Sequence, residues 1–204
     1  MSNLFPIFYL GPIEYYAEII KHEQIILEQY EHLPKQTYRN RTEILGPNGV
    51  LKLLVPIIKT RTRLAIKDEA IADTDNWQKT HWKSLEAAYR SSPYFEFYEQ
   101  DFYKLYHTPT RFLTPFNLEL HEVIMRLLGV TQITKLSASY TTAEGQDYRN
   151  YFSSKKEAEN QKLKDNRYIQ VFSDRMQFQP NLSIVDLLFN EGPNALAYLK
   201  EIGK

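Results

Sequence analysis

The chain has 204 residues, with 25 basic and 25 acidic side chains, a formal net charge of +0 and no cysteine. This length suits one well-buried domain, and the balanced charge argues against a general nucleic-acid binder, which needs excess Lys and Arg to neutralise phosphates. The absence of cysteine excludes a disulfide framework, a thiolate nucleophile and a thiolate metal site.

The first segments alternate between strand-forming and helix-forming patterns. PIFYL at 6–10 predicts a short buried strand, Gly11-Pro12 a turn, 13–22 a helix with apolar residues at helical spacing, and 24–31 a second strand. Two prolines break the apolar N-terminal run, which also lacks a basic leader. We therefore expect neither a signal peptide nor a membrane span, and a cytoplasmic protein.

A β-hairpin is predicted next. Residues 37–45 (TYRNRTEIL) and 50–58 (VLKLLVPII) are strand-like, and Gly46-Pro47-Asn48-Gly49 between them has the composition of a turn. Because side chains alternate along a strand, Arg39 and Arg41 are expected to share one face. Either the arginines keep a solvated edge strand soluble, or they bind an anion.

Helical patterns dominate the middle of the chain. They cover 76–92, 95–107 and 113–130, and 132–140 then returns to a strand pattern. The polar stretch 144–166 is open to three interpretations: a loop, a frayed helix or a mobile lid.

The C-terminal part predicts a strand at 167–172 and an amphipathic helix at 182–202, interrupted by Gly192-Pro193. No linker marks a domain boundary. We therefore predict an α+β fold: a single domain over residues 1–204, in which a small N-terminal mixed sheet is covered by helices.

Standard catalytic signatures are absent. The sequence has no phosphate-binding glycine loop, no GxSxG and no HExxH, and the spacing of His22 and His32 is weak for a metal site. We predict no metal site, and the sequence identifies no cofactor. His81 shares a helix face with Trp77 and Ser84, so it is either a shielded general base or a histidine at the edge of the core.

Several segments together resemble the WbqC-like family of bacterial proteins. They are PIFYL, TYRNRTEI, a hairpin ending in LLVPI, NWQKTHWKSLEAAYRSSPYFEFY and FQPNLSIVDLLFNEG, in this order over most of the chain. The stretch DYRNYFSSKKEAENQKLKDN departs from the family, whose members often have a longer Gly- and Tyr-containing segment there.

The resemblance implies an enzyme that modifies a sugar or carrier-linked intermediate of surface-polysaccharide biosynthesis, such as by acyl or aminoacyl transfer. The alternative is a non-catalytic binding or scaffold protein of the same pathway. The expected partner is a small-molecule or sugar-linked substrate, and the oligomeric state stays open.

The resemblance also suggests site residues. The positions matching family motif residues are Asn40, Arg41, Trp77, His81, Ser84, Asp186 and Asn190. We predict His81 as a catalytic base and Asn40 as the residue that orients the reacting group. The predicted substrate-binding residues are Arg41, Lys35, Tyr38, Trp77, Ser84 and Asp186. Asp186 has a second interpretation, as a buried aspartate paired within the core.

Overall fold

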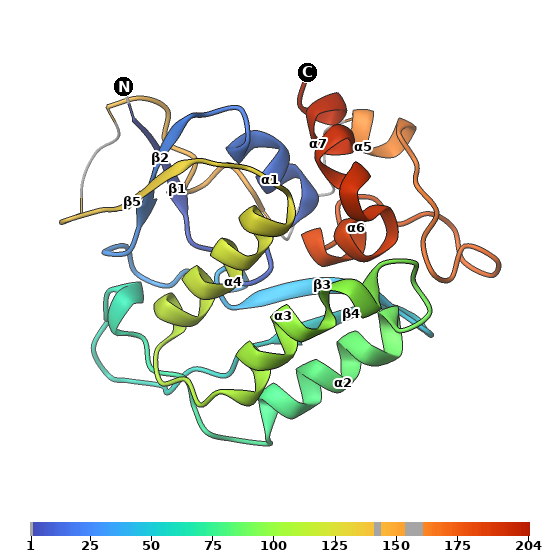
Figure 1. Cartoon of the computed structure of the whole chain (residues 1–204). Helices are drawn as coiled ribbons and strands as arrows, with labels where there is room; N and C mark the ends of the chain where they lie inside the picture. Colours follow the sequence, from blue (N-terminus) through green and yellow to red (C-terminus); the bar gives the residue numbers. More distant parts are fainter. Residues whose placement is uncertain (1, 141–143, 154–160) are drawn as a thin grey trace.

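Three parallel strands form the N-terminal sheet of the structure, a computed structural model that describes residues 2–140, 144–153 and 161–204 (Figure 1). The strand order is β1 (Asn3–Pro6), β2 (Gln24–Glu28) and β5 (Ile133–Leu136). Parallel neighbours need a crossover connection, which α1 (Ile13–Ile19) supplies between β1 and β2. The carboxyl ends of all three strands therefore lie at one edge.

The predicted hairpin forms a separate sheet. Its strands are β3 (Arg41–Gly46) and β4 (Gly49–Leu54), paired antiparallel with Gly46 opposite Gly49. Gly49 has φ of +115°, a conformation that L side chains rarely adopt, which explains a glycine at this turn. Parallel and antiparallel pairing both occur, but in two sheets and not in one.

Helices pack around both sheets (Figure 1). Helix α2 (Trp77–Tyr89) contacts β3, and α3 (Phe95–His107) lies between α2 and α4 (Leu113–Leu127). The 3₁₀ turn η1 (Ile66–Asp68) contacts α4. No helix in the described part of the chain is long and apolar enough to cross a membrane.

The C-terminal elements are α5 (Gln161–Asp165), α6 (Ile184–Glu191), the 3₁₀ turn η2 (Gly192–Asn194) and α7 (Ala195–Gly203). The predicted interruption at Gly192-Pro193 coincides with η2. Helix α7 packs on α1, and α6 contacts α3 and β3, so the two ends of the chain share one cluster of buried hydrophobic side chains. The predicted α+β fold is confirmed.

Some predicted strands differ from the structure. Residues 7–10 follow β1 as buried irregular chain, and the Tyr9 amide donates to the Tyr38 carbonyl over 2.9 Å. Residues 37–40 are turns, so Arg39 and Arg41 do not share a strand face. Residues 167–172 form no strand, because no other described segment pairs with their backbone, although Tyr168 and Gln170 point inward and hydrogen-bond Asp186.

Part of the polar stretch 144–166 packs against β1. The Tyr148 amide donates to the Leu4 carbonyl over 2.8 Å, and the Tyr148 ring stacks on Phe5 with centroids 4.3 Å apart. Tyr148 and Phe152 are both buried. Residues 154–160 of the stretch lie outside the described residues.

Candidate functional site

Asn40 and Arg41 have separate surroundings at the start of the hairpin. The Asn40 side-chain amide donates to the Val55 carbonyl over 3.1 Å, and the Val55 amide donates to the Asn40 carbonyl over 2.8 Å. Asn40 thus hydrogen-bonds Val55, the residue after β4, through both its backbone and its side chain. Arg41 donates to the Gln36 carbonyl over 3.3 Å.

His81 lies inside the protein, next to Trp77 as its spacing predicted. The two rings meet edge to face with centroids 5.2 Å apart, and His81 Nδ1 lies 2.8 Å from the Tyr9 hydroxyl, which also bonds Tyr106. Burial lowers the pKa of His81 to about 4. His81 is therefore neutral at pH 7, and inside the core it bonds the Tyr9 hydroxyl and the backbone of Leu54, the last residue of β4.

Asp186 is a buried residue of α6 whose side chain hydrogen-bonds two residues of the segment between α5 and α6. Its Oδ2 accepts hydrogen bonds from the Tyr168 hydroxyl (2.5 Å) and the Gln170 amide (3.0 Å), and burial raises the pKa of the carboxyl group. Asn190 donates to the Asp186 carbonyl over 2.7 Å.

The remaining predicted residues have other side-chain partners. Ser84 donates to the Thr80 carbonyl one helical turn back (2.9 Å), and Tyr38 is buried against Phe8. Lys35 is exposed and lines a pocket. The structure therefore brings His81 together with Trp77 and also places it beside the Asn40-Arg41 segment: His81 bonds the backbone of Leu54, which pairs with Arg41, and the next residue, Val55, bonds Asn40. Asp186 has its partners on α6 and in the chain just before that helix.

A cluster of buried ion pairs occupies the carboxyl edge of the parallel sheet. Just after β2, Glu31 accepts from two guanidinium nitrogens of Arg39, over 2.7 and 2.8 Å. The Arg39 side chain is only 3% exposed. A third bond, from Arg39 to the Arg149 carbonyl (2.9 Å), ties this pair to the segment that packs on β1. The planar fork of arginine matches a carboxylate in this two-point geometry.

Arg149 completes the cluster. It pairs with Asp147 over 2.5 Å, and its Nη1 lies 3.7 Å from Oε2 of Glu28, the last residue of β2. Within the described residues these two atoms, Nη1 and Oε2, are buried and make no hydrogen bond. The Ser137 hydroxyl after β5 donates to the other Glu28 oxygen over 2.9 Å. Strands β2 and β5 thus contribute residues to this edge, and the segment that packs on β1 supplies Asp147 and Arg149.

Two adjoining pockets open at this edge. The first, of about 500 Å³, is lined by Tyr30, Glu31, His32, Tyr140, Arg149 and Asn150. The second, of about 410 Å³, is lined by His32, Leu33, Pro34, Lys35, Arg63, Leu64 and Glu69. We call them the aromatic pocket and the basic pocket. Ligands of open parallel sheets bind in a crevice at the carboxyl ends of the strands.

His32 is the residue that lines both pockets. Its Nδ1 lies 2.9 Å from the Leu64 carbonyl, which only accepts, so in the neutral ring Nδ1 carries the proton and Nε2 is the free acceptor. Glu69 lines the basic pocket beside it. Burial raises the pKa of the Glu69 carboxyl, and the positive charge of His32 partly offsets this rise.

The electrostatics of the edge favour a polar ligand. Burial raises the pKa of Glu31 although Arg39 opposes the shift. The Arg149 guanidinium lies 4.8 Å from the centre of the Tyr140 ring, whose side chain is 65% exposed. An exposed aromatic ring beside buried charges is an arrangement that binds the apolar face and the hydroxyls of one ligand. In the described part of the chain, no group of three or more metal-ligating side chains occurs.

Sequence reasoning missed most of this edge. The buried arginine of the TYRNR segment is Arg39 and not Arg41, and the partners of Arg39 lie 8 and 110 positions away. The sequence around His32 favours an ordinary surface or capped histidine over a metal ligand. The available signal was its place directly after the β2 pattern, because residues that follow parallel strands meet at one edge.

The fold and this edge define the class of the protein: an α+β domain with a charged, two-part pocket where its parallel strands end. The WbqC-like protein family matches residues 6–161 and 146–198, and the chain belongs to this family. An uncharacterized protein of Mycobacterium tuberculosis, Rv1507c, is 29% identical over 207 residues, covering 87% of each chain. No solved structure matches the chain.

Proposed function

We propose that this protein is a cytoplasmic transferase that modifies a nucleotide-linked or carrier-linked sugar in bacterial surface-polysaccharide biosynthesis, by acyl or aminoacyl transfer. One observation carries the proposal. His32, with its Nδ1 held by the Leu64 carbonyl, stands at the junction of an aromatic pocket and a basic pocket. An oriented imidazole between two subsites is the arrangement that a proton-transfer reaction needs.

The two pockets fit the two parts of such a substrate. In the aromatic pocket, Tyr140 stacks on the apolar face of a sugar ring while Glu31 and Arg149 bond its hydroxyls. In the basic pocket, Lys35 and Arg63 bind the phosphates that link the sugar to its nucleotide or carrier. Lys35 thus keeps its predicted substrate-binding role.

His32 is the proposed general base. The sugar hydroxyl or amine attacks the carbonyl carbon of the acyl donor, and His32 Nε2 takes the proton that this oxygen or nitrogen loses. A new ester or amide bond forms, and the bond from the carbonyl carbon to the donor's oxygen or sulfur breaks. The imidazolium, stabilised by Glu69, then gives its proton to this leaving group.

A matched pair of histidine variants tests the proposal. His32 and His107 are both exposed, and in both residues Nδ1 lies within hydrogen-bond distance of a backbone carbonyl. With a nucleoside-diphosphate amino sugar and acyl thioesters as probes, mass spectrometry detects the transferred group. We expect His32→Gln to slow turnover at least about 100-fold with unchanged substrate affinity, and His107→Gln to behave as wild type. Equal turnover by both variants would contradict the role of His32.

A non-catalytic binding protein is the second candidate function. It is favoured by the internal partners of the residues that match family motifs: His81 bonds Tyr9, Asn40 bonds Val55, and Asp186 bonds Tyr168. This candidate predicts sugar binding at the same edge without any transferred group. Turnover that depends on His32 excludes it.

A further inference from the structure

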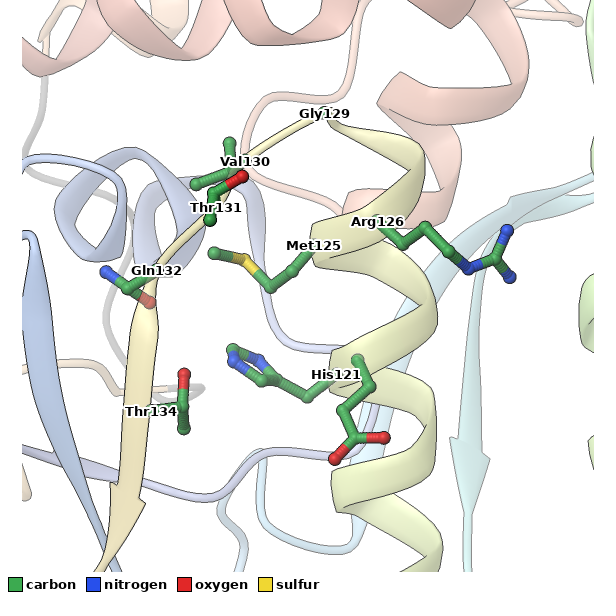
Figure 2. A pocket seen from close by; sticks show the side chains of 9 residues that line it. His121, Met125, Arg126, Gly129, Val130, Thr131, Gln132 and Thr134 are labelled. Carbon is green, nitrogen blue, oxygen red and sulfur yellow. The ribbon is translucent and has the colours of Figure 1, made fainter.

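A third pocket lies on another side of the parallel sheet, between the C-terminal half of α4 and the start of β5 (Figure 2). Its volume is about 590 Å³. It is lined by His121, Glu122, Met125, Arg126, Gly129, Val130, Thr131, Gln132 and Thr134. None of these residues lines the aromatic or the basic pocket.

His121 is the first of two buried polar groups in this pocket. Its ring points from α4 into the space facing β5 (Figure 2), is only 4% exposed, and stacks on Tyr16 with centroids 5.9 Å apart. Within the described residues its Nε2 is buried and has no hydrogen-bond partner. Burial lowers the pKa of His121 to about 4, so the ring is neutral at pH 7, and Nε2 either accepts a hydrogen bond from a hydroxyl or donates one to it, depending on the tautomer.

The side chain of Gln132 is the second buried polar group in this pocket. Its side-chain nitrogen donates both hydrogens, to the Ile19 carbonyl over 2.8 Å and the His22 carbonyl over 2.6 Å. These bonds fix the orientation of the amide, so the other end is the acceptor Oε1. In the described part of the chain, this Oε1 is also buried without a partner. A buried polar atom without a hydrogen bond costs about 1–3 kcal/mol, so two in one pocket point to a ligand that completes them.

The charges around the pocket decide what kind of ligand fits. Arg126 pairs with Asp101 over 2.8 Å, and in Figure 2 its guanidinium points away from His121. Glu122, on the same wall, makes anions unfavourable. An ammonium group is also disfavoured beside these two buried groups, because removing it from water needs a charged partner at the same depth. Uncharged hydrogen-bond donors remain, and hydroxyl groups are the simplest.

We propose that this pocket is a second binding site, for an uncharged polyhydroxyl compound of the size of a monosaccharide. One ligand hydroxyl donates to Gln132 Oε1, and another hydroxyl bonds His121 Nε2. The hydroxyls of Thr131 and Thr134 bond other hydroxyl groups of the ligand. Met125 and Val130 contact the C–H surface of the ligand. The site is independent of the proposed transferase activity, since it shares no lining residue with that site.

Nuclear magnetic resonance on the wild-type protein tests the site without any variant. The side-chain nitrogen signals of His121 report on bonding at Nε2 directly. We expect D-glucose, D-galactose or myo-inositol to shift them saturably, and glucose 6-phosphate and glucosamine at pH 7 to bind at least about tenfold more weakly. No shift with any uncharged polyol, or stronger binding of the anion or the amine, would overturn the proposal.

Two variants assign the binding to the pocket. His121→Phe keeps a ring for stacking on Tyr16 and removes the ring nitrogen that bonds the ligand, so polyol affinity should fall at least about tenfold. The control, His107→Phe, makes the same change on α3 beside Tyr103, outside the pocket, and should bind as wild type. Tyr140→Ala, in the aromatic pocket, should also leave this polyol affinity unchanged, which separates the two sites. Equal polyol affinity for His121→Phe and wild type would contradict the assignment.

Discussion

The two arginines of TYRNR differ in burial and partners, and this difference is testable. Arg39 makes three hydrogen bonds inside the protein, whereas Arg41 is only half-buried. Lysine keeps the charge but not the planar fork. We expect Arg39→Lys to lower the free energy of unfolding by about 2–3 kcal/mol, because two charge-assisted bonds are lost. Arg41→Lys should lower the free energy of unfolding by much less. Urea unfolding compares them, and equal losses would contradict this account of Arg39.

Histidine burial predicts a loss of stability in weak acid. His81 and His121 both have a pKa lowered to about 4, while unfolded histidine titrates near its ordinary value of 6.5. Between these values the unfolded chain binds more protons, so stability is full above pH 6.5 and falls as the pH drops toward 4. Each histidine contributes about 3 kcal/mol to this loss.

The variant His81→Gln tests whether His81 contributes to this loss of stability at low pH. It should reduce the change in unfolding free energy between pH 6.5 and pH 4 by about half, because His121 still titrates. The exposed control His107→Gln should leave the pH dependence as in wild type. An unchanged pH dependence in His81→Gln would show that His81 is not shielded as described.

At the scale of elements, the local patterns predicted helices better than strands. The helix at 95–107 matches α3 at both ends, because its apolar spacing is local information. The predicted strand at 37–45 begins only at Arg41. Arg39 pairs with Glu31 at the edge of the parallel sheet, so the residues before Arg41 form a turn there and do not extend β3. The strand pattern at 167–172 has no pairing partner among the residues that the structure describes. Tertiary contacts determine whether such segments form strands, and these contacts cannot be read from the local sequence pattern.

Helix α6 is anchored by its buried aspartate, and the structure predicts which substitution it tolerates. Asp186→Asn keeps an acceptor for Tyr168 and removes a buried charge, so stability at pH 7 should change by less than about 1 kcal/mol. Asp186→Ala leaves Tyr168 and Gln170 without their acceptor and should cost about 2–3 kcal/mol. Thermal melts rank the two variants. An Asn variant as unstable as the Ala variant would contradict this reading of the network.

For the whole molecule, composition and pattern were enough for the fold class but not for the site. Of the eight predicted site residues, Lys35 lines a pocket of the proposed site, and no strong sequence motif marks this residue. The charges that build the edge, such as Glu28 and Arg149, are distant in sequence and meet only in the folded chain. Their spacing therefore carries no local signal.

The shared core predicts one unfolding unit, as expected for a single domain over residues 1–204. Buried side chains from α1, α2, α6 and α7 belong to one cluster. Both tryptophans, Trp77 and Trp82, lie in α2, so fluorescence follows that helix while circular dichroism follows all helices. The two urea transitions should coincide. Separate midpoints would indicate two units.

Binding of a nucleoside-diphosphate sugar tests the two-part pocket most directly. Isothermal titration with UDP-glucose and UDP-N-acetylglucosamine compares wild type with Tyr140→Ala and Lys35→Ala, one exposed residue from each pocket, and with Lys200→Ala, an exposed lysine on α7. We predict that at least one of these sugars binds wild type and Lys200→Ala equally, and both pocket variants about tenfold or more weakly. Binding that neither pocket variant weakens, or no binding of either sugar to wild type, would contradict the proposed site.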